Sequence, residues 1–277
     1  RLAHRAAALT SQERGLITQT RIAPNFFAAS EACAKAAARP EHSGAARLAT
    51  CPLLQERWYS RGRAVATENR NGSNNGGAEV KLAELDRIFR ARSVAIIGAS
   101  TDPNCVGRQI LDNLLQFGYT GRVYAVNPKA QEIGGLRCYP SVRAIEEPLE
   151  LAVLVVPRAA VLPVVEDCIA KHVGGLVVVT AGFRELDEEG ARLEARLRER
   201  TAQAGIPLLG PNCMGLFNAD SDVRLNLTFA PVPPRPGHVA FLSQSGALGA
   251  MVLSLAETTG LGFSLFASLG NEAGVNH

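Results

Sequence analysis

The sequence predicts an α/β protein built around a doubly wound parallel sheet, and three observations carry this prediction. Short apolar runs alternate with amphipathic helical patterns from residue 81 onward. The runs are apolar throughout rather than at every second residue, which is typical of strands covered on both faces. Several runs end at glycine or at a small polar residue, as strands do where they turn into a following helix.

The elements of the first half are predicted in chain order, each from its own pattern. Helices are indicated by apolar residues at i, i+3 and i+4, and strands by short β-branched runs. Pro163 lies within the third expected helix, and we expect it in the first turn, where proline is tolerated. The expected elements are helix 82–89, strand 94–97, helix 107–117, strand 123–126, strand 151–156 and helix 161–172.

The second half continues the alternation and then changes after a proline-rich linker at 231–237. A charged helix is expected at 188–204, with Glu188/Arg192 and Glu194/Arg198 as i,i+4 pairs. One β-α-β unit after the linker is too small for a parallel-sheet domain, so we expect an incomplete second domain at 231–277, after a first domain at 81–230. The remaining expected elements are strands 176–179, 207–209, 238–242 and 263–268, and helix 247–258.

Composition excludes several classes of protein. The net charge of +3 argues against a dedicated nucleic-acid binder, and no apolar run approaches the ~20 residues of a membrane span. None of the six cysteines forms a C-x-x-C pair, and the five histidines show no metal-ligand spacing. We therefore expect no metal site, no disulfide framework, no nucleic-acid partner and no membrane partner.

The first eighty residues differ from the rest of the chain. Residues 1–78 hold 11 basic and 5 acidic side chains, a balance of +6, and are rich in alanine and serine. This composition is typical of an organellar transit peptide, and Arg57-Trp58-Tyr59-Ser60 resembles a mitochondrial cleavage site. A polar Gly/Asn linker follows at 69–77. We expect a mitochondrial location; the alternative is a disordered extension of a cytoplasmic protein.

A phosphate-binding turn is predicted where the run 94–97 stops at Gly98. Backbone N–H groups and a helix N-terminus converge in such turns. The turn 98–107 is not G-x-G-x-x-G, and Asn127 stands after the second strand, where NAD-binding proteins carry an acid. Lys129 nearby suits a phosphorylated ribose. The residues alone leave two ligands open: NADP, or coenzyme A with its 3′-phosphate.

Six segments in order resemble the CoA-binding part of the ADP-forming acyl-CoA synthetases. This family includes ADP-forming acetate–CoA ligase, and succinyl-CoA ligase α subunits are more distant relatives. The resemblance runs from about residue 82 to 272 and implies a Rossmann-like CoA-binding domain, followed by the start of a flavodoxin-like domain. The segments are IIGAS, VYAVNPK, LAVLVVP, VVVTAGF, LLGPNCMG and FLSQSGAL.

The resemblance implies an acid–thiol ligase that converts a carboxylate, CoA and ATP into acyl-CoA, ADP and phosphate. ATP, ADP and Mg would act through an ATP-grasp domain or β subunit outside this chain. The phosphorylated histidine of the family is expected beyond residue 277, so the chain alone is expected to be inactive. Near its end, Gly274 and Asn276 stand where the family has acids.

The resemblance also assigns site residues by position. Cys213 is interpreted as a packing thiol and His238 as a strand-end residue. Asn212 and the segment Ser243, Gln244, Ser245 and Gly246 would face the phosphoryl site. The residues implied for CoA are Gly98, Ser100, Thr101, Val106, Gly107, Lys129, Val156, Pro157, Thr180, Ala181 and Gly182.

Two other functions remain open at the level of the sequence. The chain could be a CoA-sensing binding module without a catalytic half. It could also be an NADP-dependent reductase, which a titration with CoA against NADP would distinguish from both CoA-binding functions.

Overall fold

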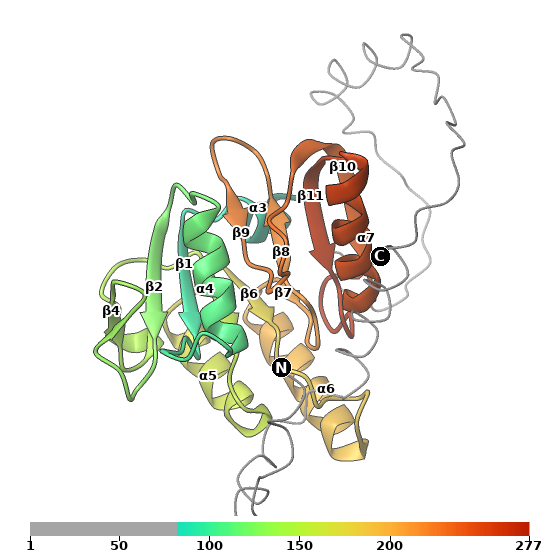
Figure 1. Ribbon diagram of the computed structural model, residues 1–277. Helices are drawn as coiled ribbons and strands as arrows, with labels where there is room; N and C mark the ends of the chain where they lie inside the picture. The colour runs from blue at the N-terminus through green and yellow to red at the C-terminus, as the bar shows by residue number, and fades with distance from the viewer. Residues whose placement is uncertain (1–81, 277) are drawn as a thin grey trace, which may run out of the picture. The chain divides into compact units, whose positions relative to one another are not determined.

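The computed structural model describes residues 82–276, with side chains from Leu85 onward (Figure 1). The expected targeting segment, its cleavage-like Arg57–Ser60 and its linker lie outside these residues. The elements are α3 (Leu82–Phe89), β1 (Ser93–Ile97), α4 (Val106–Gln116), β2 (Arg122–Val126), β3 (Glu132–Ile133), β4 (Leu136–Tyr139), the 3-10 turn Val142–Ala144, β5 (Leu151–Leu154), α5 (Arg158–Ala170), β6 (Gly175–Val178), α6 (Glu188–Gln203), β7 (Leu208–Leu209), β8 (Leu216–Asn218), β9 (Leu225–Asn226), β10 (Pro236–Ser243), α7 (Gly246–Thr259) and β11 (Phe263–Ser268).

A seven-stranded sheet in the order β3-β4-β2-β1-β5-β6-β7 forms the centre of the first domain. Every pairing is parallel except that between β3 and β4. Counting only the parallel strands along the chain, the order is 3-2-1-4-5-6, that of the dinucleotide-binding doubly wound fold. The predicted fold class is confirmed. Ligands of such sheets bind beyond the carboxyl ends of the strands where the order reverses, which is between β1 and β5 here.

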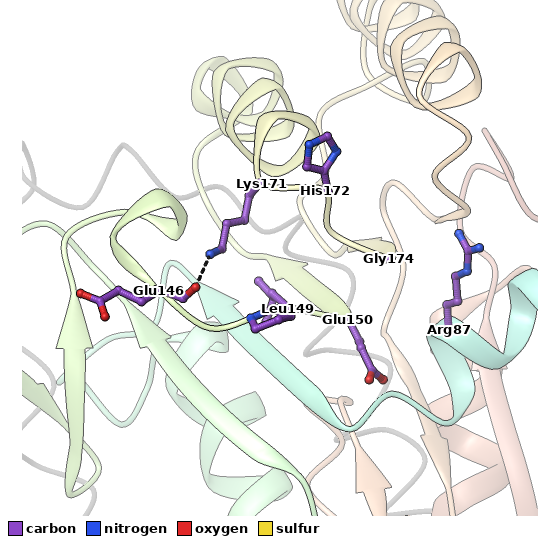
Figure 2. A pocket seen from close by; sticks show the side chains of 8 residues that line it. Arg87, Glu146, Leu149, Glu150, Lys171, His172 and Gly174 are labelled. Carbon is purple, nitrogen blue, oxygen red and sulfur yellow. Dashed lines mark hydrogen bonds between the residues drawn. The ribbon is translucent and has the colours of Figure 1, made fainter.

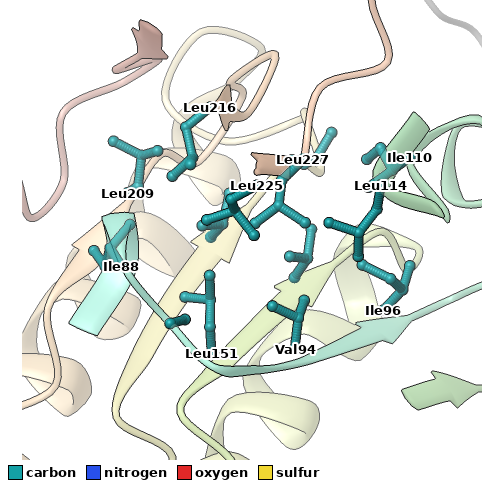
Figure 3. Close-up of a cluster of buried hydrophobic side chains, with 14 of the residues drawn as sticks. Ile88, Val94, Ile96, Ile110, Leu114, Leu151, Leu209, Leu216, Leu225 and Leu227 are labelled. Atoms are coloured by element: carbon teal, nitrogen blue, oxygen red, sulfur yellow. The ribbon is translucent and has the colours of Figure 1, made fainter. Parts of the chain in front are cut away.

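The sheet is covered on both faces, which explains the continuous apolar runs. All five residues of β1 are buried. Val94 and Ile96 pack on one face with Ile110 and Leu114 of α4 (Figure 3). The intervening residues of β1 belong to a second cluster, on the opposite face, with apolar residues of α5 and α6. Helices on both faces leave the loops at the strand ends as the open part of the domain.

The remaining strands of the described chain form a second sheet, in the order β10-β11-β8-β9. β10 and β11 are parallel and are joined by α7, as the sequence predicts. The rings of Phe217 and Phe266 stack with centroids 5.6 Å apart in the core of this unit. β11 pairs with β8, across the expected domain boundary at 230/231, which stays a prediction.

The residues after β11 return to the first sheet. The backbone N–H groups of Asn271, Ala273 and Val275 donate to the carbonyl oxygens of Pro211 (2.8 Å), Gly210 (3.0 Å) and Leu208 (2.8 Å). These three hydrogen bonds lay residues 271–275 along β7 and the turn that follows it.

The contact between the segment 271–275 and β7 is close at Gly274, where the resemblance leads us to expect an acid. A Cβ atom at this position would lie 2.5 Å from the Leu208 carbonyl oxygen. This arrangement therefore accepts glycine and leaves no space for an acidic side chain.

The expectation for Pro163 was wrong. Pro157 is the N-cap of α5, so the helix begins at Arg158 and Pro163 is its sixth residue, beyond the first turn. The strand before it is also shorter than expected and ends at Leu154.

The structure also corrects the expected i,i+4 pair of Glu194 and Arg198. Glu194 is only 6% exposed, and its carboxylate pairs with Arg184 at 3.4 Å. The pair of Glu188 and Arg192 is present at 3.4 Å on the exposed face of α6.

No helix within residues 82–276 has the length and apolar character needed to cross a bilayer.

Candidate functional site

The predicted phosphate turn lies at the switch point of the sheet. Gly98 ends β1 with φ +94°, and a Cβ atom there would lie 2.1 Å from the Val155 carbonyl oxygen, just beyond β5. Gly107, in the first turn of α4, would place a Cβ atom 2.1 Å from the Gly98 carbonyl oxygen. The two glycines therefore allow the start of α4 to rest directly on the ends of β1 and β5.

Asp102, which the sequence analysis overlooked, orders the exposed part of this turn. The Ser100 hydroxyl oxygen accepts from the Asp102 N–H at 3.1 Å, and the Asp102 carboxylate accepts from the Asn104 N–H at 2.9 Å. The backbone hydrogen bond from Asn104 is the largest influence on the pKa of Asp102 and lowers it. An Asp-x-Asn turn of this kind is a sequence signal that could have been recognised.

The N-terminus of α4 presents backbone N–H groups to this turn. Its N-cap, Cys105, makes no side-chain hydrogen bond to the helix, and the first turn carries no acid. Thr101 is exposed, and Val106 is half-buried as the first helical residue. An uncapped helix N-terminus after a glycine turn is suited to an anionic ligand.

Asn127 connects the turn to the end of β2. Its amide nitrogen donates to the Ala99 carbonyl oxygen at 2.7 Å, and its amide oxygen accepts from the Lys129 N–H at 2.9 Å. Asn127 is therefore engaged on both sides and holds two loops together. Within the described part of the chain, the exposed Lys129 ammonium group makes no hydrogen bond or ion pair. A single cationic group thus remains available beside the phosphate turn.

The loops after β5 and β6 form a second wall beside Gly98. The Thr180 hydroxyl donates to the Val156 carbonyl oxygen at 2.8 Å, and Arg158 donates to the Gly182 carbonyl oxygen at 2.9 Å. Pro157 is exposed at the start of α5, and Ala181 is exposed between the two bonded residues of its loop. The structure therefore brings the five residues predicted for these two loops together.

Arg158 was not among the predicted residues, although it follows one of them directly. Its guanidinium group binds Asp187 at 3.1 Å and Glu189 at 3.2 Å, in addition to the Gly182 carbonyl. These contacts connect the start of α5 to the start of α6. Arg158 is thereby committed to protein contacts that fix the separation of the two loops.

Asn212 lies beside the Thr180 loop, after a cis peptide bond between Gly210 and Pro211. Its N–H donates to the Thr180 carbonyl oxygen at 3.0 Å. Its side-chain amide donates to the Asn271 amide oxygen at 3.2 Å. Asn212 therefore joins the Thr180 loop to the segment after β11.

The segment 243–246 forms the N-terminus of α7. The Ser245 hydroxyl oxygen accepts from the Leu248 N–H at 3.2 Å, and the Ser243 hydroxyl donates to the Ser245 carbonyl oxygen at 3.0 Å. Gln244 is exposed, and Gly246 is the first helical residue. The two hydroxyl groups are used in hydrogen bonds that order the turn. The groups that remain for contact with a ligand are therefore the backbone of this segment and the Gln244 side chain.

A cluster of two glutamates and one asparagine links these parts, and the sequence analysis did not foresee it. The Asn271 amide nitrogen donates to Glu185 at 2.6 Å and to Glu194 at 2.7 Å. The other Glu185 oxygen accepts from the Gly182 and Phe183 N–H groups. Burial acts to raise the pKa of Glu185, but the hydrogen bonds from Asn271 and the two backbone N–H groups outweigh it and lower the pKa.

Cys213 is a packing thiol, as interpreted from the sequence. Its sulfur lies 3.4 Å from the Val178 carbonyl oxygen, and burial raises its pKa to about 12. A thiol of this kind is a poor nucleophile at neutral pH. His238 lies in β10 and contributes nothing to the loops described above. Residues 82–276 contain no group of three or more His, Cys, Asp or Glu side chains that could hold a metal ion.

A cavity of about 480 Å³ lies away from the candidate site (Figure 2). It is lined by Leu149 and Glu150, which precede β5, and by Gly174, which precedes β6. Lys171 closes one side, with its ammonium group donating to the carbonyl oxygens of Ile145 and Glu146. The cavity therefore opens at the amino ends of the strands, whereas the candidate site lies at their carboxyl ends.

Two family models match this chain. Residues 92–219 match the family described as CoA binding domain, and residues 236–277 match the succinyl-CoA ligase like flavodoxin domain. Every predicted site residue lies within one of these two matched segments.

Three relatives illustrate the similarity. Acetate–CoA ligase (ADP-forming) I of Archaeoglobus fulgidus is 48% identical over 189 residues, which cover 68% of this chain and 27% of that protein. The α subunit of acetate–CoA ligase (ADP-forming) II of Pyrococcus furiosus is 42% identical, over 68% of this chain and 40% of that subunit. A solved structure from Ca. Korarchaeum cryptofilum, a dinucleotide forming acetyl-coenzyme A synthetase 1 in complex with phosphate and ADP, matches with a TM-score of 0.66 and 42% identity, over 69% of this chain and 40% of that one. The chain thus spans less than half the length of these three relatives.

Proposed function

Because this chain carries the CoA binding domain found in the ADP-forming acyl-CoA synthetases, we propose that it is the CoA-binding portion of an acid–thiol ligase. The complete ligase would convert a carboxylate, CoA and ATP into acyl-CoA, ADP and phosphate. The chain's own part in this reaction is to bind CoA and to place its thiol end near a phosphate site.

One observation carries the proposal: the turn at Gly98 and the uncapped N-terminus of α4 lie at the switch point of the sheet, and Lys129 follows the neighbouring strand β2 at the same edge. β1 and β2 are parallel neighbours with Ile97 opposite Val126, so the loops after them share one edge. Asn127 has both amide atoms engaged, and no acid stands ready for the ribose diol of NAD. The free cation favours a phosphorylated ribose.

Different residues at this edge of the sheet would bind different parts of the CoA molecule. The turn formed by Gly98, Ser100, Thr101, Val106 and Gly107 would hold phosphate, and Lys129 would meet the 3′-phosphate of the nucleotide half. The adenine and pantetheine path would run between Val156-Pro157 and Thr180-Ala181-Gly182, whose separation is fixed by the Thr180 and Arg158 hydrogen bonds.

The phosphoryl site of the complete enzyme would lie next to this path. Asn212 and the N-terminus of α7, from Ser243 to Gly246, would face it, because a helix of 14 residues favours an anion at its N-terminus. ATP, ADP and Mg would be bound by an ATP-grasp domain or a β subunit. The α-subunit relative from P. furiosus supports a partner of this type.

Replacement of Lys129 tests the ligand assignment. Lys129→Ala should weaken CoA binding by about 1–2 kcal/mol, roughly 5- to 30-fold, because one charge-assisted hydrogen bond is lost. Binding of dephospho-CoA, which lacks the 3′-phosphate, should change less. Isothermal titration calorimetry with CoA, dephospho-CoA and NADP measures each affinity directly.

Lys129→Arg is the matched control, since it keeps the charge and should retain most of the preference for CoA. An equal loss for CoA and dephospho-CoA would show that Lys129 does not read the 3′-phosphate. Tighter binding of NADP than of CoA by the unaltered chain would contradict the proposed function and favour a reductase.

We also propose that residues 1–78 direct the protein to mitochondria. Support comes from the balance of +6 and the cleavage-like Arg57-Trp58-Tyr59-Ser60. The three relatives described above are archaeal and bear on the CoA-binding part alone.

A further inference from the structure

Glu185 contacts the Thr180–Gly182 loop directly and is connected to Asn212 through Asn271. We propose that it is a positioning residue that couples occupancy of the CoA path to the geometry of the phosphate site. The inference rests on the proposed function, because it assumes that CoA lies along the Thr180–Gly182 loop.

The first contact of Glu185 is with the wall of the CoA path. One carboxylate oxygen accepts from the N–H groups of Gly182 and Phe183, the latter at 3.1 Å. Gly182 has φ +101°, a conformation that L side chains rarely adopt. The carboxylate thus fixes the backbone at the point where the loop turns beside the path.

The second contact is with the segment after β11. The other oxygen of Glu185 accepts from the Asn271 amide nitrogen at 2.6 Å, and Glu194 accepts from the same nitrogen at 2.7 Å. Both N–H bonds of the Asn271 amide are then used, which leaves its oxygen to accept from Asn212 at 3.2 Å. The direction of each hydrogen bond is therefore fixed by the two negative acceptors.

The chain of contacts continues to the N-terminus of α7. The N–H of Leu269, two residues before Asn271, donates to the Ser243 carbonyl oxygen at 2.8 Å. The N–H of Asn271 donates to the Pro211 carbonyl oxygen at 2.8 Å, next to Asn212. A displacement of the Gly182 backbone is thus transmitted through Glu185 and Asn271 to both loops that would face the phosphoryl site.

The geometry predicts positive coupling between two ligands. CoA bound along the Thr180–Gly182 loop would order this loop and, through Glu185, Asn271. Phosphate would then bind to loops around Asn212 and Ser243 that are already ordered. The coupling must be reciprocal, so phosphate should favour CoA by the same factor by which CoA favours phosphate.

Glu185→Gln separates coupling from simple packing. Glutamine keeps the shape and can still accept from the loop N–H groups, but it turns an NH₂ group toward the NH₂ group of Asn271. We expect the affinity for CoA to rise at least fivefold in saturating inorganic phosphate for the unaltered full-length chain, and less than twofold for Glu185→Gln. Glu199→Gln, on the exposed face of α6, is the matched control and should keep the fivefold effect. Isothermal titration with CoA, with and without phosphate, measures these factors.

Hydrogen exchange of backbone amides, read by mass spectrometry without ligand, tests the connection independently of CoA. In Glu185→Gln, exchange should rise in residues 180–186 and also in 269–275, whereas Glu199→Gln should change neither. Coupling that persists in Glu185→Gln, or CoA binding by the unaltered chain that ignores phosphate, would overturn the proposal. If the chain binds no CoA, the proposed function fails, and the exchange data alone then decide: a rise confined to 180–186 refutes the connection through Asn271.

Discussion

At the scale of single residues, Gly98 shows how a strand end becomes a place for a ligand. Its φ of +94° and the 2.1 Å approach of a virtual Cβ to the Val155 carbonyl both exclude a side chain. The backbone of β1 can therefore turn away beside β5, and α4 can begin directly against it.

Gly98→Ala should destabilise the protein by about 1–3 kcal/mol from backbone strain alone, with a further loss from the overlap with Val155. CoA affinity should fall with it, because the turn must move to relieve the contact. Urea unfolding followed by circular dichroism, together with calorimetric titration, gives both quantities.

Gly135→Ala separates the cost of backbone strain from the cost of overlap with Val155. Gly135 also has a positive φ, +77°, but a Cβ atom there would have nothing within 4 Å. It should show the conformational cost without the overlap and without loss of CoA affinity. Equal destabilisation by the two substitutions would mean that the contact with Val155 is unimportant.

Single residues also show where sequence reasoning succeeded and where it could not. Gly98 was correctly expected to end a strand in a tight turn, because a short apolar run that stops at glycine has a local meaning. Cys213 was correctly interpreted as a packing thiol on the strength of the family resemblance. Glu194 was expected to lie on the surface, since its spacing to Arg198 is that of a helical ion pair. Its partner Asn271 is 77 positions away in sequence, and only the tertiary fold brings the two together.

At the scale of elements, α6 depends on its first residues. The Asp187 carboxylate caps the helix by accepting from the Gly190 N–H at 2.6 Å, and it also binds Arg158. The backbone hydrogen bond from Gly190 and the hydrogen bond from Arg158 lower the pKa of Asp187. A folded-state pKa below the unfolded value means that this charge stabilises the fold above the unfolded pKa.

Asp187→Asn should lower the urea midpoint at pH 7 and pH 5, because asparagine still caps the helix but lacks the charge that binds Arg158. The stability that the charge contributes is lost as the pH falls through the folded pKa, which lies below the ordinary value of 3.8. The two proteins should therefore converge as the pH falls below 3.8 and through the folded pKa of Asp187. Asp86→Asn, on the exposed face of α3, should match the unaltered protein throughout. A difference between Asp187→Asn and the unaltered protein that does not shrink as the pH is lowered through the acid range would exclude this explanation.

The elements that the sequence analysis missed fall into two kinds. The hairpin of β3 and β4 carries its own signal, Gly134-Gly135 between two short runs, and could have been predicted. β8 and β9 could not, because two- and three-residue strands exist only through pairing, and β8 pairs with β11, nearly fifty residues later. Strongly periodic segments such as β11 were predicted with the correct bounds.

At the scale of the whole molecule, the contacts group the described residues together. Residues 78–277 form one compact unit by their contacts. The strand order of the first sheet follows from the alternation of strands and helices, whereas the return of the segment 271–275 to β7 does not. No local pattern indicates that return, since residues 271–275 form a turn and bends rather than a helix or strand.

Removal of residues 1–78 should leave the melting temperature and the CoA affinity unchanged and should abolish import into mitochondria. Residues 1–78 contain no residue of the candidate site, and the proposed import would depend on their positive charge. Differential scanning fluorimetry, titration and fluorescence microscopy of fusion proteins test the three parts. A fusion of residues 1–80 that stays diffuse in the cytosol would refute mitochondrial targeting. The segment would then be interpreted as an N-terminal extension without a targeting function.

The pairing of residues 271–275 with β7 has a consequence for synthesis on the ribosome. The outer edge of β7 stays uncovered until the Val275 N–H reaches the Leu208 carbonyl oxygen, and an open edge can pair with other chains. Roughly seventy residues separate the two, so at 5–20 residues per second the edge stays unprotected for about 3–14 s during translation. The nascent chain therefore needs protection for that interval, and a ribosome that pauses shortly before residue 271 prolongs it.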